Sequence, residues 1–221
     1  MASAHSHSHT PEADAPTHGH LIRWAPSYDL VVTLLTLGRS RVMRQRTVEL
    51  AELRPGESVL EVGCGTGAVA RAASTRVGLA GQVFGIDPSG EMIAEARRKA
   101  ARHHVQIDFR VAGIEALPLP HASVDAALSS LMMHHLPADL KRAGLAEVRR
   151  VLKPGGRLVI VDFGRRRGLL SHLALSAIVH HSSEHSVEDL VPVLEDAGFG
   201  DFRTGELGIM SLGFVTARAA G

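Results

Sequence analysis

The stretch Val59-Leu-Glu61-Val-Gly63-Cys-Gly65-Thr-Gly67 decides the fold. An apolar segment of strand character runs into three alternating glycines, and the residues that follow have the pattern of a helix. Glycine allows the backbone to turn tightly and leaves room for a ligand to lie against it. The N-terminus of the following helix adds unpaired N–H groups and the positive end of a helix dipole. The stretch therefore predicts a strand, a ligand-binding loop and a helix.

Strands and helices alternate along the rest of the chain. The expected strands are 58–62, 82–86, 106–111, 124–129, 157–163, 199–206 and 209–217. The expected helices are 68–76, 89–103, 138–152, 169–181 and 187–197. Such alternation with short turns favours a parallel sheet covered on both faces, and the last two strands, joined by a short turn, predict an antiparallel hairpin at one end. The predicted fold class is α/β, a Rossmann-like doubly wound sheet of seven mostly parallel strands.

Three regions are expected along the chain. Residues 1–20 are rich in histidine and poor in apolar side chains, which predicts a disordered tail. Imidazoles at this density also suit a transition metal, but a flexible tail is the interpretation we favour. Residues 21–56 are expected to form an N-terminal helical cover, with two helices separated near Gly38, and residues 57–221 the main domain, which carries the glycine loop.

Composition excludes several classes of protein. Lys plus Arg (24) nearly balances Asp plus Glu (23), and aromatic residues make up only 4%, which argues against nucleic acid as a partner. Cys64 is the single cysteine, so an internal disulfide is excluded and a reducing cytoplasm is expected. No apolar run approaches the roughly 20 residues of a transmembrane helix, and no secretory signal is visible. We expect a cytoplasmic protein.

An acidic residue follows the glycine loop at the end of the next strand. Asp87 stands where a carboxylate accepts hydrogen bonds from both hydroxyls of a ribose. The spacing of Gly63, Gly65 and Ala68 also fits a dinucleotide-binding loop, so a nicotinamide oxidoreductase is an alternative. Glu61 argues against it, because a carboxylate beside the loop repels a pyrophosphate. The chain also lacks a recognisable Tyr-x-x-x-Lys pair.

Further segments carry a family resemblance. Over nearly the whole span 28–218 the chain resembles the class I S-adenosylmethionine-dependent methyltransferases, and within them the small-molecule branch typified by ubiquinone and menaquinone biosynthesis. The matching segments are 59–67, 84–92, 115–120, 123–126 and 147–156. The resemblance implies S-adenosylmethionine as cofactor, S-adenosylhomocysteine as product, and methyl transfer to the O, C, N or S atom of a small molecule. A non-catalytic cofactor binder is a further alternative.

The resemblance also implies positions for the cofactor. Gly63 and Gly65 would pass under its methionine part, and Glu61 would lie near its ammonium group. Asp87 would hold the ribose. Many relatives have an Asp where Gly113 stands, so a side-chain contact to the adenine amine is missing here. The full implied set is Tyr28, Glu61, Gly63, Cys64, Gly65, Asp87, Pro88, Met92, Gly113, Ile114 and Ser129.

Some of these residues have a structural alternative. Pro88 and Met92 would flank the adenine and Ile114 would meet its edge, but Met92 also suits a helix core. Cys64 suits a small filler of the loop. Ser129 would lie near the methionine carboxylate, and Tyr28 would cover the methionine end.

Histidines mark the expected rim of the pocket. His134 and His135 follow the fourth strand and are the candidate catalytic residues, because imidazole titrates near neutrality and can deprotonate a phenol, enol or thiol. Alternatively they start a helix or pack under the cofactor. A second group is His180, His181 and His185.

The expected acceptor is a small, apolar or aromatic molecule, and no metal ligand set is predicted. Two basic runs, one at 39–46 and one at 165–167, are compatible with weak contact to an anionic membrane surface. The sequence leaves the oligomeric state open.

Overall fold

A computed structural model describes residues 12–17, 25–164 and 186–221 of the 221-residue chain. The predicted helix at 169–181, the basic run at 165–167 and the histidines at 180, 181 and 185 lie outside the described residues. None of the helices in the described part combines the length and the apolar composition needed to cross a bilayer.

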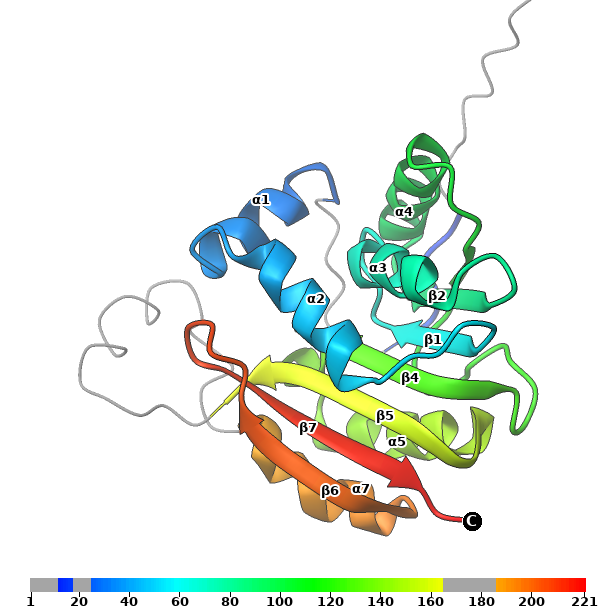
Figure 1. Ribbon diagram of the computed structural model, residues 1–221, viewed down its shortest axis with the longest axis vertical. Coiled ribbons are helices and arrows are strands. Elements are labelled where there is room, and N and C mark those ends of the chain that lie inside the picture. Colours follow the sequence, from blue (N-terminus) through cyan, green and yellow to red (C-terminus); the bar gives the residue numbers. More distant parts are fainter. Residues whose placement is uncertain (1–11, 18–24, 165–185) are drawn as a thin grey trace, which may run out of the picture.

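The described residues form a seven-stranded sheet in the order β3-β2-β1-β4-β5-β7-β6 (Figure 1). The strands β1 to β5 run parallel, and β7 is antiparallel to both of its neighbours, β5 and β6. This arrangement confirms the predicted doubly wound sheet with an antiparallel hairpin at one end. The bounds are β1 Ser58–Val62, β2 Gln82–Asp87, β3 Asp108–Val111, β4 Val124–Ser130, β5 Leu152–Phe163, β6 Phe199–Glu206 and β7 Leu212–Ala219.

Helices cover both faces of the sheet. On one face lie α1 to α4, and on the other lie α5 and α7 (Figure 1). The α-helices are α1 Ala25–Leu35, α2 Ser40–Leu50, α3 Ala68–Val77, α4 Gly90–Arg102, α5 Ala138–Val151 and α7 Val191–Asp196, and the 3-10 helices are η1 Met133–His135 and η2 Val187–Leu190. A separate hydrophobic core fills each side of the sheet, because β1, β2, β4 and β5 present apolar side chains to both faces.

The starts of two strands differ most from the sequence expectation. β5 begins at Leu152, not at 157, because Leu152 already pairs with Val124 before a register shift restarts the ladder at Ala126 and Arg157. β7 begins at Leu212, because Ile209 is buried in the turn that precedes it and accepts a hydrogen bond from Leu212. In both places apolar residues and turn residues are adjacent, and the sequence pattern alone assigns them to the wrong element.

The prediction of a disordered tail over 1–20 needs correction for residues 12–17. These residues run along the end of β2 and the start of α4, where Ala15 donates to the carbonyl of Pro88 at 2.9 Å. The rest of the predicted tail lies outside the described residues.

The topology places a binding site at one end of the sheet. The chain leaves β1 toward β2 on one side, and β4 pairs on the other side of β1. The order of strands reverses between β1 and β4, and open α/β sheets bind ligands at the carboxyl ends of the strands at such a point. The glycine loop after β1 and Asp87 at the end of β2 both lie there.

Candidate functional site

A cavity of about 680 Å³, its open mouth included, lies at the carboxyl ends of β1, β2, β3 and β4. The residues that line it are Thr17, Tyr28, Val62, Gly63, Gly65, Asp87, Pro88, Met92, Ala112, Gly113, Ile114, Glu115, Leu131, Met132, His135 and Leu136. The lining is mostly apolar, with a few polar groups that converge from different segments of the chain.

The glycine loop adopts a backbone that other residues rarely reach. The φ angles of Gly63, Gly65 and Gly67 are +68°, +49° and +71°, in the left-handed region that glycine enters without a steric cost. A Cβ on Gly63 would lie 2.3 Å from Cγ of Met132, and one on Gly67 would lie 2.5 Å from Cζ of Phe109. Glycine is therefore required at 63 and 67 for both conformation and space.

Asp87 holds the loop and faces the cavity. Its Oδ2 accepts a hydrogen bond from the Gly65 N–H and its Oδ1 accepts one from the Ser89 N–H, both at 2.9 Å. Burial, with a smaller contribution from nearby Asp14, raises the pKa of Asp87 to about 6 against the lowering effect of the two hydrogen bonds. A carboxylate offers about four acceptor positions, so two stay available for the hydroxyls of a ribose.

The helical cover is fastened to the loop by α1. The carboxylate of Asp29 accepts hydrogen bonds from the hydroxyl of Thr66 at 2.7 Å and from Nζ of Lys99 at 2.8 Å. Next to it, Tyr28 reaches over Gly65, whose Cβ position lies 3.2 Å from Cε1 of the ring. Burial raises the pKa of the Tyr28 phenol, so it stays protonated at neutral pH.

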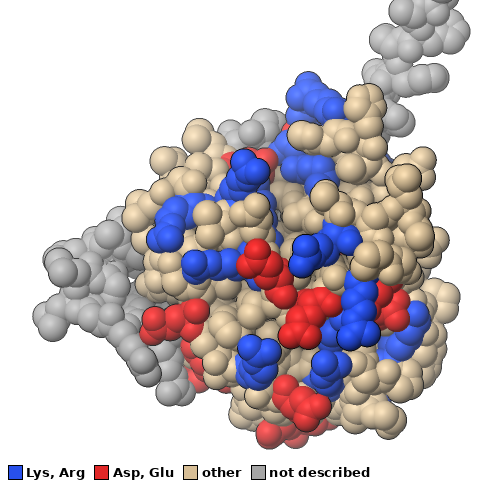
Figure 2. Space-filling view, viewed as in Figure 1, with Lys and Arg blue, Asp and Glu red and all other residues tan. Residues whose placement is uncertain are grey.

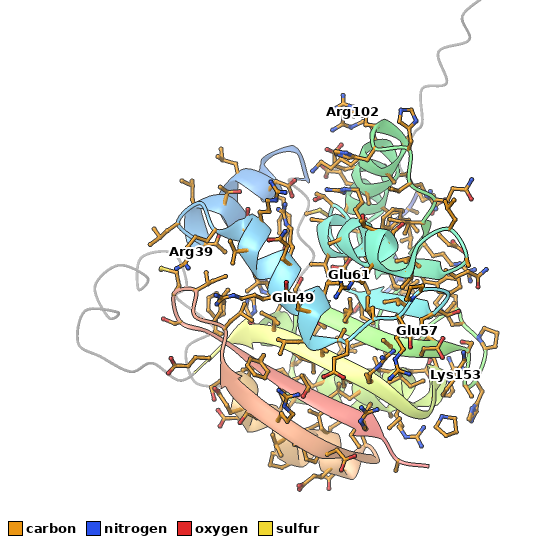
Figure 3. The ribbon with its side chains drawn as sticks, viewed as in Figure 1. Arg39, Glu49, Glu57, Glu61, Arg102 and Lys153 are labelled. Carbon is orange, nitrogen blue, oxygen red and sulfur yellow. The ribbon has the colours of Figure 1, made fainter. Side chains whose placement is uncertain are left out.

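Glu61 is inside the molecule, between α2 and α3 (Figure 3). It lines a second, smaller cavity that shares Tyr28, Gly63 and Leu131 with the larger one, and it does not line the larger cavity. Its Oε2 accepts a hydrogen bond from the Ala70 N–H at 2.7 Å, in the first turn of α3. The carboxyl group thus satisfies one of the unpaired donors of a helix N-terminus.

The charge state of Glu61 differs from the negative charge that the sequence analysis assumed. Burial, with a smaller contribution from Asp87, raises the pKa of Glu61 to about 8 against the lowering effect of the hydrogen bond from Ala70. Glu61 is therefore mostly protonated at neutral pH. The repulsion of a pyrophosphate, which we inferred from a negative Glu61, is weaker than expected.

This shifted pKa predicts a pH dependence of stability. A carboxyl group whose pKa is raised by folding stabilises the folded state below its ordinary pKa, and this contribution is lost as pH rises toward 8. We expect the free energy of unfolding of the wild type, relative to that of Glu61→Gln, to fall between pH 5 and pH 8, with a slope of at most about 1.4 kcal/mol per pH unit. Thermal melts of both proteins across this range measure the difference. A stability difference between the two proteins that does not change with pH would contradict the raised pKa of Glu61.

The two candidate catalytic histidines have different surroundings. The imidazole of His134 is held by buried Asp162, with 2.6 Å between Nδ1 and Oδ1, and its backbone N–H donates to Oδ2 at 3.1 Å. His135 lines the cavity, and its ring centroid lies 3.8 Å from that of His134. Since a carboxylate only accepts hydrogen bonds, Nδ1 of His134 carries the proton of the neutral ring. Sequence reasoning missed Asp162, which is 28 residues away.

Leu131 turns the chain from β4 into this region. Its φ of +53° is unusual for a residue other than glycine, and its N–H donates to the carbonyl of Val161. The turn directs Met132 and His135 to the cavity. Strained backbone of this kind is often found at binding sites.

Two of the buried polar atoms without a hydrogen-bond partner among the described residues are Oε2 of Glu115, at the cavity, and Oγ of Ser129, near the end of β4. Glu115 lines the cavity, and a Cβ on Gly113 would lie 2.4 Å from that oxygen. The Glu115 carboxylate thus occupies the space where a side chain at 113 would stand. A buried polar atom without a partner costs roughly 1–3 kcal/mol, and a ligand with a donor group would satisfy Glu115.

The structure brings most of the expected cofactor-binding residues into one cavity. These are Tyr28, Gly63, Gly65, Asp87, Pro88, Met92, Gly113 and Ile114, together with His135. Glu61 and buried Cys64 line the smaller cavity, and Ser129 lines neither. The sequence reasoning missed Thr17, Glu115 and Met132.

On the face shown in Figure 2, Lys and Arg side chains predominate in the upper half of the view, and acidic and basic side chains are interspersed in the lower half. Among the described residues no group of three or more His, Cys, Asp or Glu side chains is arranged to hold a metal ion.

Comparison with known proteins adds an independent line of evidence. Residues 59–156 match the family described as "Methyltransferase domain". The 2-phytyl-1,4-naphtoquinone methyltransferase of Trichormus variabilis is 34% identical over 145 residues, which cover 65% of this chain and 62% of that protein. The demethylmenaquinone methyltransferase of Thermus thermophilus is 38% identical over 139 residues, 63% of this chain and 62% of that protein. The chain thus spans less than two thirds of the length of these relatives.

A solved structure matches over a larger share. The crystal structure of a SAM-dependent methyltransferase from Aquifex aeolicus superposes with a TM-score of 0.68 at 25% identity, over 89% of this chain and 97% of that one. The match extends over both faces of the sheet, beyond the segment 59–156 that carries the family motifs.

Proposed function

We propose that the chain is a class I S-adenosylmethionine-dependent methyltransferase and that it transfers a methyl group from S-adenosylmethionine to a small aromatic acceptor; the matching methyltransferase domain, the relatives and the solved structure support this proposal. The observation that carries the proposal is the cavity in which the glycine loop, Asp87 and the segment after β4 meet. Its lining fits the cofactor, because Asp87 retains acceptor positions for a ribose and Glu115 retains one for an amine.

The cofactor, when bound, supplies a methyl group on a cationic sulfur. The residues of this chain hold and orient it: Gly63 and Gly65 provide a backbone surface, and Tyr28 covers the loop from α1. Leu131, Met132 and Leu136 form an apolar wall that excludes water. Alignment of the two reactants in such a site contributes roughly 7–11 kcal/mol to the lowering of the barrier.

We propose His135 as the base that takes a proton from the acceptor, because it lines the cavity. His134 is then a positioning residue, fixed by Asp162 on one side and packed on His135 on the other. A base is required when the acceptor is a protonated phenol or quinol. The names of the relatives include methyltransferases of naphthoquinone compounds, which supports an aromatic acceptor of the quinone type.

The reaction is tested with radiolabelled S-adenosylmethionine and a panel of naphthoquinols, simple phenols, thiols and amines. Transfer of label to the quinols or phenols is the expected result, with S-adenosylhomocysteine formed in equal amount. Transfer only to thiols or amines would contradict the proposed acceptor class but would still show methyltransferase activity. Absence of transfer to every acceptor, in a protein that binds the cofactor, would favour a non-catalytic binder.

A further inference from the structure

The N-terminal segment of residues 12–17, here called the strap, is fixed to the part of the chain that carries Asp87. The Ala15 N–H donates to the carbonyl of Pro88, and the Gly90 N–H donates to Oδ1 of Asp14, both at 2.9 Å. Glu12 forms an ion pair with Arg97 on α4, also at 2.9 Å. These contacts extend from the end of β2 to the second turn of α4, so the strap is attached at several points.

The strap packs directly against Gly90. A Cβ at this position would lie 1.8 Å from the carbonyl oxygen of Glu12, a distance that no side chain tolerates. Gly90 is the first residue of α4, and its φ lies outside the left-handed region that favours glycine. The close approach of the strap therefore explains the glycine at this position, which the helix alone does not require.

The strap also reaches the cavity. Thr17 lines it together with Asp87 and Pro88. The strap is acidic, and the carboxylate of Asp14 accepts a hydrogen bond from the Gly90 N–H at the N-terminus of α4. A helix N-terminus without such a carboxylate attracts phosphate. A ligand with a neutral ribose fits beside these carboxylates, whereas a phosphate on the ribose meets a negative charge.

We propose that the strap is a wall of the cofactor site, which slows release of the adenosyl ligand and disfavours nucleotides with a phosphorylated ribose. This inference rests on the proposed function. It assigns a role to residues outside the span 59–156 that matches the methyltransferase family.

Gly90→Ala tests the strap in the full-length protein. Alanine favours the helix, so α4 is retained, and the added methyl group displaces the carbonyl of Glu12. We expect the dissociation constant of S-adenosylhomocysteine, measured by calorimetry, to rise about tenfold, the equivalent of one hydrogen bond to a charged group. Gly200→Ala is the matched control, because a Cβ there meets nothing within 4 Å.

Asp14→Ala completes a double-mutant cycle. If Gly90→Ala displaces the strap, Asp14→Ala weakens binding in the wild type and adds nothing in the Gly90→Ala protein. A second readout is cleavage after Glu12 by a glutamate-specific protease, which is expected to be slow in the wild type with S-adenosylhomocysteine and fast in Gly90→Ala.

The outcomes separate this inference from the proposed function. Equal affinity and equal cleavage in wild type and Gly90→Ala, with normal binding of S-adenosylhomocysteine, would refute the proposed role of the strap. The proposed methyltransferase function would then still stand. A wild type that does not bind S-adenosylhomocysteine would overturn both, and a difference in cleavage would then show only that the segment packs on α4.

Discussion

Replacement of His135 by glutamine is expected to lower kcat with a phenolic or quinol acceptor by about 10²–10⁴-fold, the range of general base catalysis. Glutamine keeps a polar side chain at the cavity but does not accept a proton at neutral pH. The dissociation constant of S-adenosylhomocysteine is expected to stay within about twofold, because the cofactor is held by the loop and by Asp87. Steady-state kinetics and calorimetry measure the two quantities.

Two variants control this experiment. His121→Gln removes an exposed histidine outside the cavity and should leave kcat unchanged. Asp162→Asn weakens the hold on His134 and should lower kcat less than His135→Gln while it shifts the pH profile of kcat, which a purely structural role would not do. An unchanged kcat in His135→Gln would mean that the acceptor ionises without help from the protein.

Asp87→Ala is expected to raise the dissociation constant of S-adenosylhomocysteine by at least about 100-fold. The variant removes two acceptors for the ribose, and a hydrogen bond to a charged group contributes about 1.5–3 kcal/mol, where 1.4 kcal/mol corresponds to a factor of ten. The loop also loses its hydrogen bond from Gly65 to Asp87, which adds to the effect.

Asp87→Asn separates the two contributions, because the amide oxygen still accepts one of the backbone hydrogen bonds. Asp108→Asn is the matched control on the neighbouring strand, where the carboxylate pairs with Arg110 outside the cavity. Melting temperatures without ligand show whether each variant is folded. Unchanged affinity in a folded Asp87→Ala protein would refute the ribose assignment.

The sequence predicted the elements well where periodicity and turn residues agree. β1 was expected over 58–62 and is found there, because an apolar strand ends directly at glycines that cannot continue it. The start of β5 was misplaced, since Lys-Pro-Gly-Gly at 153–156 is typical of a turn that ends a helix and here forms part of a bulged strand. Local patterns do not contain the partner strand that decides such cases.

The site was predictable in its backbone and less so in its side chains. Asp87 and the glycines follow from spacing along the chain, and the structure brings them together. Asp162 and Thr17 join the site through contacts between segments far apart in sequence, which no local motif encodes. Ser129 was expected beside the cofactor, but its hydroxyl is buried within the fold and lines neither cavity.

The most direct test of the central claim is isothermal calorimetry of the full-length protein with S-adenosylhomocysteine, S-adenosylmethionine and NAD, each titrated under the same conditions. The account predicts saturable binding of the two adenosyl ligands at one site and no binding of NAD. A ligand present at 100 times its dissociation constant also adds about 2.7 kcal/mol to stability, so a thermal shift provides a check. Binding of NAD without binding of either adenosyl ligand would contradict the account and assign the glycine loop to a dinucleotide.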